Sequence, residues 1–138
     1  MARNTSSSTS VDEAHRWTYE VRDQIAALSL DPATTLLALM RVIRNNRAAG
    51  YDAPFRAWAL HDRLARAVVE KVDQVRLDPV RSQFVALGFA EGDAENRARL
   101  FLYYEVAASA IFTELSAEQH EQLLLERHRF LTTVRVVD

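Results

Sequence analysis

Residues 100–112, with the sequence LFLYYEVAASAIF, decide the fold that we predict for this chain. Nearly every side chain in this segment is apolar or aromatic, over about three and a half turns of α-helix. A helix that is apolar on all sides has to be covered on all sides. One face can pack on the chain's own domain, and the other needs a partner chain or a complete shell of further helices. Because 138 residues leave little material for such a shell, we favour the partner chain.

A second apolar segment, the three leucines at 123–125, raises the same problem in the helix that follows. Two such helices from each of two chains can form an intermolecular four-helix bundle with two-fold symmetry, which makes the protein a homodimer. The alternative is a central helix buried within a single chain. The residues expected in the dimer contact are Tyr103, Ala107, Ile111, Leu123, Leu124 and Phe130.

The composition predicts that the rest of the chain is helical as well. Three Gly and three Pro are too few for a β-sandwich, a barrel or a phosphate-cradling α/β enzyme, which need many tight turns. The absence of Cys excludes disulfide scaffolds, Cys-based zinc sites and thiol catalysis. A net charge of −2 gives no excess of positive charge with which to bind nucleic acid. No uncharged stretch is long enough to span a membrane and no secretory signal is visible, so we predict a cytoplasmic all-α protein.

The chain divides into a Ser/Thr-rich polar tail at residues 1–10, too polar to fold, and one helical domain at residues 11–138. Within the domain, apolar side chains recur at spacings of three and four. Six helices joined mostly by short connections are expected to form a compact bundle. They span residues 11–28, 32–48, 53–60, 63–87, 94–115 and the segment that follows Ser116.

Capping residues set several of these boundaries. Asp31, Asp62 and Asp93 are each placed to cap the helix that follows, and Ser116 with Gln119 has the spacing of a capping box.

The longest helix, at residues 63–87, has a proline inside it and a glycine after it. Pro79 cannot donate a backbone hydrogen bond, so a kink or a break is expected near Asp78. Gly88 is expected to end the helix.

Three short motifs follow one another in a characteristic order. FRAWALHD at residues 55–62 places Trp-Ala before a capping Asp, VALGF at 85–89 ends the long helix, and AENRARL at 94–100 begins the next one. This order and spacing resemble the C-terminal half of tetracycline-repressor-like (TetR family) transcriptional regulators, over about residues 11–134. Glu105 and Ala107 depart from the family, which usually has an aliphatic residue and a glycine there.

The resemblance implies a regulatory domain that binds a small effector and dimerises. In the family, a helix-turn-helix head that binds DNA precedes this domain, whereas only the polar tail precedes the first helix here. We therefore expect contact with DNA only through such a head, and no DNA binding by this chain alone.

A pocket for a small, largely apolar ligand is one interpretation of the large inward-facing side chains, with Glu105 as a polar anchor. The other interpretation is an ordinary core, with Glu105 at a rim position and paired to an arginine of its own chain or of the partner chain. The candidate ligand-binding residues are Met40, Trp58, Phe84, Phe101, Tyr104 and Glu105.

The sequence offers no positive sign of catalysis, metal or cofactor. The four His residues lack helical zinc spacing, and no Gly-rich phosphate loop or Gly-x-Ser-x-Gly motif is present. We expect no enzyme. The alternative function is a helical dimeric protein-interaction module with a solid core and no ligand, which tight packing of the aromatic side chains would favour.

Overall fold

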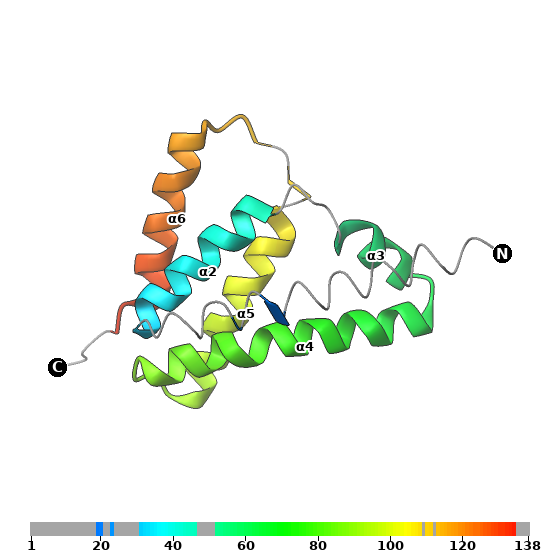
Figure 1. Ribbon diagram of the computed structural model, residues 1–138, viewed down its shortest axis with the longest axis horizontal. Coiled ribbons are helices and arrows are strands. Elements are labelled where there is room, and N and C mark those ends of the chain that lie inside the picture. The colour runs from blue at the N-terminus through cyan, green and yellow to red at the C-terminus, as the bar shows by residue number, and fades with distance from the viewer. Residues whose placement is uncertain are drawn as a thin grey trace.

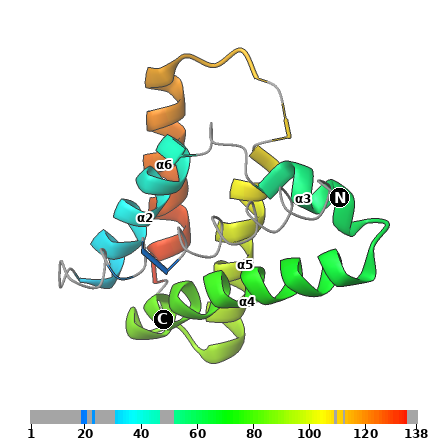
Figure 2. The ribbon, with the colours of Figure 1, turned by 45° about the vertical axis from the view of Figure 1, so that its right-hand side comes forward.

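The computed structural model describes residues 19–20, 23, 31–46, 52–108, 110–111 and 113–134. Within these ranges the chain forms five helices and no strand, which confirms the all-α prediction for the described part. In Figures 1 and 2, α4 is the longest helix, α3 lies beside its first half, and α2, α5 and α6 stand on one side of it. The helices are α2 (Pro32–Asn46), α3 (Asp52–Ala59), α4 (Arg63–Ala86), α5 (Glu91–Ala108) and α6 (Ala117–Thr132).

The sixth expected helix, at residues 11–28, lies outside the described residues, apart from Tyr19, Glu20 and Asp23, which are helical. The polar tail expected at residues 1–10 lies outside them too.

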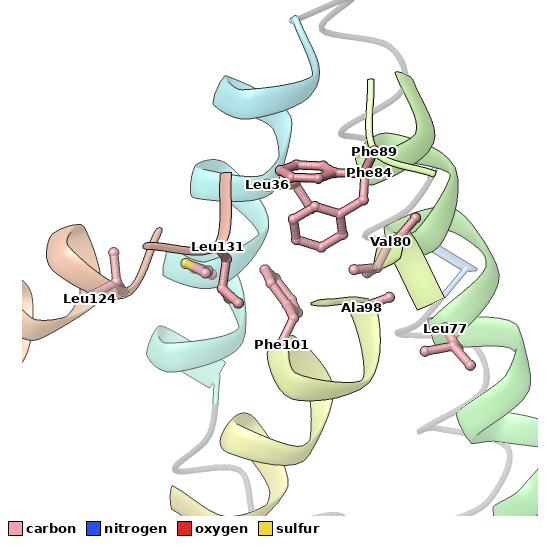
Figure 3. Close-up of a cluster of buried hydrophobic side chains, with 11 residues drawn as sticks. Leu36, Leu77, Val80, Phe84, Phe89, Ala98, Phe101, Leu124 and Leu131 are labelled. Carbon is pink, nitrogen blue, oxygen red and sulfur yellow. The ribbon is translucent and has the colours of Figure 1, made fainter. Parts of the chain in front are cut away.

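The core lies where α2, α4, α5 and α6 meet. α4 packs against both α3 and α5, while α2 packs against α4 and α6. Figure 3 shows the rings of Phe84, Phe89 and Phe101 together beside Leu36. Each fully buried Leu or Phe contributes about 1.5–3 kcal/mol to stability. The largest fully buried side chains are Phe84, Phe101, Leu36, Met40, Leu124 and Val80.

Two aspartates begin α2 and α4 as the sequence predicts. Asp31 accepts hydrogen bonds from the Thr34 backbone N–H (3.1 Å) and the Thr34 hydroxyl (2.6 Å). Asp62 accepts from the N–H groups of Leu64 (2.8 Å) and Ala65 (3.0 Å). Each carboxylate satisfies N–H groups that have no partner within the helix, and this holds the helix start in place.

The start of α6 confirms the predicted capping box. The Ser116 hydroxyl accepts from the Gln119 N–H (3.1 Å), and the Gln119 side-chain oxygen accepts from the Ser116 N–H (2.8 Å).

A Schellman motif at Gly88 ends α4 and turns the chain into α5. The Gly88 N–H donates to the Val85 carbonyl (2.9 Å) and the Phe89 N–H to the Phe84 carbonyl (3.2 Å). Gly88 has φ of +106°, a conformation that residues with a Cβ rarely adopt. The Phe84 and Phe89 rings meet edge to face with centroids 6.0 Å apart, so the turn is also part of the core.

Of the kink or break expected near Asp78, the break does not occur. α4 stays helical through Pro79 from Arg63 to Ala86. Leu77, Val80 and Phe84 are buried in the same core on both sides of the proline. We attribute the continuous helix to this packing, which offsets the one backbone hydrogen bond that Pro79 cannot donate.

α5 differs from the expectation at both ends. It begins at Glu91, so Asp93 lies inside its first turn and pairs with Arg97 (3.1 Å) instead of preceding the helix. It ends at Ala108, well before residue 115, and the N–H groups of Ala110 and Ile111 fold back to the Ala107 carbonyl. No Gly or Pro marks this turn, so the sequence carries no signal for it.

We expect Gly88→Ala to lower the free energy of unfolding by about 1–2 kcal/mol, because an L side chain is strained at this positive φ. No atom lies within 4 Å of the added Cβ, so the backbone alone causes the loss. Gly92→Ala is the matched control, since its Cβ also meets open space but lies in α5. It should leave stability unchanged or raise it by up to ~1 kcal/mol. Urea unfolding measures both, and equal effects would contradict this assignment.

Candidate functional site

An apolar stripe runs along the outer side of α5. Leu100, Tyr103, Tyr104 and Ala107 are spaced as neighbours on one helical face, and all are exposed. Ile111, in the turn after α5, extends the series and is 62% exposed. The opposite side of α5 is buried through Ala94, Ala98, Phe101 and Glu105.

A second stripe runs along α6. Leu123 and Phe130 lie two helical turns apart and are exposed, Phe130 by 74%. Val134, four residues after Phe130 and just beyond the helix, is also exposed. Leu124 and Leu131, each one residue further along the helix, point into the core instead.

The two stripes meet at Arg127. This residue lies between Leu123 and Phe130 on α6, and its guanidinium stacks 3.7 Å above the centre of the Tyr104 ring on α5. Arg97 of α5 makes a second link, because its Nη1 donates to the Leu131 carbonyl (2.9 Å) near the end of α6. We define the residues of the two stripes together as the apolar face, namely Leu100, Tyr103, Tyr104, Ala107, Ile111, Leu123 and Phe130.

A buried ion pair lies directly beneath the apolar face. Arg127 Nη2 donates to Glu105 Oε1 over 3.3 Å, and the two side chains are only 16% and 5% exposed. Glu105 is thus paired with an arginine of its own chain, as one of the two sequence interpretations expects. It is buried rather than placed at a rim.

Of the candidate ligand-binding residues, the structure brings three together. Met40, Phe84 and Phe101 belong to one core cluster and are at most 1% exposed. Trp58 on α3 and Tyr104 on α5 are exposed at the surface instead. The set therefore does not line one common space.

Of the candidate dimer residues, five lie on the apolar face and one does not. Leu124 is 2% exposed and packs in the core, because successive residues of a helix point about 100° apart and the three leucines cannot share a side. Leu124 is therefore a core residue, and its prediction as part of the dimer contact is wrong. The sequence interpretation did not include Leu100 in the dimer contact, although its four-residue spacing from Tyr104 was the available signal. It also gave no role to Arg127, although this residue lies at helical spacing between Leu123 and Phe130.

The carboxylate of Glu121 on α6 links this helix to α2. Its carboxylate pairs with Arg44 and with Arg41 (2.9 Å), both on α2. These hydrogen bonds, from Arg44 first and then Arg41, hold the pKa of Glu121 below its ordinary value. His128 makes another link, with its Nε2 2.7 Å from the Ala33 carbonyl at the start of α2.

Glu95 joins α5 to α4 in the same way. It accepts from Arg99 (2.9 Å) and from Arg81 of α4 (3.2 Å), and the pKa of Glu95 is lowered mainly by the Arg99 hydrogen bond. Arg99 also donates to the Tyr103 hydroxyl (2.8 Å), which orients one side chain of the apolar face.

No family model, no curated protein and no solved structure matches this chain. Among the described residues, no three His, Asp or Glu side chains are grouped so that they could hold a metal ion. None of the helices in those ranges is both long and apolar enough to cross a membrane.

The lowered pKa of Glu121 predicts a dependence of stability on pH. A carboxylate whose pKa is lower in the folded state stabilises the protein above its unfolded-state pKa, and this stabilisation is lost as the pH falls through the folded-state value. Glu121→Gln should therefore lower the free energy of unfolding at pH 7 and reduce its decline below about pH 5. Urea unfolding across this range measures the effect. The control, Glu114→Gln, changes an exposed residue before α6 and should keep the wild-type pH dependence.

Proposed function

We propose that this chain is a helical homodimerisation domain that serves as the effector-binding, regulatory domain of a TetR-like transcriptional regulator. The observation that carries the proposal is the apolar face on α5 and α6, left exposed by the chain's own core. Further support comes from the motifs of the resemblance, since Asp62 caps the long helix and Gly88 ends it. With its net charge of −2, the domain does not bind DNA by itself.

A second copy of the chain is the partner that best fits the apolar face. A two-fold axis sets α5 and α6 of one copy against those of the other, so that the same side chains are covered in both. Large exposed apolar patches mark sites of association, and the exposed side chains of α5 and α6 lie on either side of the Arg127–Tyr104 contact. The inner sides of both helices are already occupied by the core, so only their outer sides are available.

Charged substitutions on the apolar face should separate the dimer. We expect Ile111→Asp and Phe130→Asp each to raise the dimer dissociation constant at least about tenfold, because association would bury an unpaired carboxylate. The control is Leu64→Asp near the start of α4, where the leucine is 80% exposed and lies outside the apolar face. Sedimentation equilibrium measures the constants. A monomeric wild type, or dimers that neither substitution weakens, would overturn the pairing proposal.

The effector is a small, largely apolar molecule bound within each subunit, as the resemblance implies. Such a ligand acts by binding one arrangement of the helices more tightly than another. Met40, Phe84 and Phe101 fill the space between α2, α4 and α5, so the bound arrangement requires these side chains to move.

The same packing favours a second candidate, a dimeric protein-interaction module with a solid core and no ligand. This candidate is supported by the packing of the large side chains of the core. Met40, Phe84 and Phe101 lie in one cluster with Leu36 and Val80. In this case the apolar face is the whole of the functional surface.

Native mass spectrometry of the protein purified from its host separates the two candidates. The regulatory domain predicts a dimer that releases a small molecule when the protein is denatured, and the difference in mass gives the ligand's mass. The interaction module predicts a dimer of two bare chains whose thermal midpoint is unchanged by a panel of apolar and aromatic compounds.

A further inference from the structure

The Glu105–Arg127 pair is the least expected contact in the described part of the chain. Glu105 stands in the most apolar segment of the sequence, and its carboxylate is nonetheless buried together with the Arg127 guanidinium. Either charge alone would be costly to bury, so the two residues depend on each other.

The geometry of the pair is not that of a strong stabilising contact. The single hydrogen bond between Arg127 Nη2 and Glu105 Oε1 is 3.3 Å long, at the far end of the usual range. Among the described residues, the buried Nε of Arg127 has no hydrogen-bond partner. Well-packed apolar residues often stabilise a protein as much as a buried ion pair does, so stability alone does not account for these two residues.

The position of the pair points to a different role. The backbone of α6 packs against α2, whereas Arg97 and Arg127 make polar and ring contacts between α6 and α5. Of the two, Arg127 lies directly beneath the apolar face, stacked on the exposed Tyr104. Together with Arg97, it fixes how the α6 stripe lies relative to the α5 stripe at the place where they meet.

We propose that Glu105 and Arg127 are the specificity residues of subunit pairing, which hold α5 and α6 in the one register that a second copy of this chain recognises. This inference rests on the proposed dimerisation. Contacts between apolar side chains are non-directional and tolerate several registers. A shift of α6 along or around α5 would separate the Arg127 guanidinium from the Glu105 carboxylate, so the pair disfavours the other registers. A single buried polar residue selects register in coiled coils by the same principle.

The test replaces both charges at once and measures the geometry of the dimer. The chain has no cysteine, so a single Glu118→Cys at the exposed start of α6 takes one spin label per subunit. Electron–electron double resonance then gives the distance distribution between the two labels. The decisive variant is Glu105→Leu with Arg127→Met, which leaves no buried charge. Glu105→Gln with Arg127→Met is a milder second variant in case the first does not fold.

The wild-type dimer should give one narrow distance. Both double variants should remain dimers with a distance distribution at least about two-fold broader or with a second peak. Glu105→Leu with Arg127→Met should give a thermal midpoint near or above that of wild type, whereas Glu105→Gln with Arg127→Met should melt lower, because it keeps a buried polar group without the guanidinium. Glu105→Leu alone should lower the midpoint, because Arg127 is then buried without its partner. The matched control is Asp73→Leu with Arg56→Met, which removes an ion pair between α3 and α4 and should keep the narrow distance.

The outcomes separate this inference from the proposed function. A double variant that keeps the single narrow distance of wild type overturns the specificity role and leaves the dimer proposal intact. Broadening in the Asp73/Arg56 control as well would also overturn it, because any lost ion pair would then suffice. A wild-type chain that is monomeric by sedimentation overturns the dimer proposal itself, and the specificity role with it.

Discussion

The structure depends on a constraint in α5, which has two apolar faces but only one set of neighbours in its own chain. Ala94 and Ala98 are fully buried on the inner face, and their small side chains let α5 approach α4 closely. Phe101 fills the space between α4, α2 and α6 on the same face. These contacts cover the inner face of α5 with the described helices around it, and its outer face stays exposed. The dimer proposal follows from this imbalance rather than from any single residue.

The turn between α4 and α5 links this constraint to α6. Gly88 allows the chain to reverse, and the reversal places Phe89 against Phe84 in the core. The Arg97 guanidinium lies 4.1 Å above the Phe89 ring and donates to the Leu131 carbonyl at the end of α6. Contacts around the Phe89 ring thus hold the end of α4, the start of α5 and the end of α6 in place relative to one another. The orientation of the apolar face depends on the same contacts.

Local chemistry explains which parts of the fold could be predicted from the sequence. Asp62, Gly88 and the Ser116–Gln119 pair act on backbone groups within a few residues, so their roles are visible in the sequence. The end of α5 was predicted wrongly, and the sequence left open whether the long helix would kink or break at Pro79. α5 ends without a Gly or Pro, and the helix around Pro79 is held by core packing from other elements. Such tertiary contacts are not encoded in a local pattern.

The same distinction applies to the candidate site. The apolar run at residues 100–112 shows that α5 has exposed apolar positions, but helical geometry alone did not tell which of the leucines at 123–125 turns inward. Arg127, which pairs with Glu105, lies 22 residues away on another helix, so no spacing rule identifies the pair. The sequence does reveal a conflict, because the carboxylate of Glu105 stands in a segment that is otherwise apolar. A conflict of this kind between a residue and its local pattern marks positions where specificity or function outweighs stability. In this chain that position lies beneath the apolar face, which is why subunit pairing is the role that we assign to it.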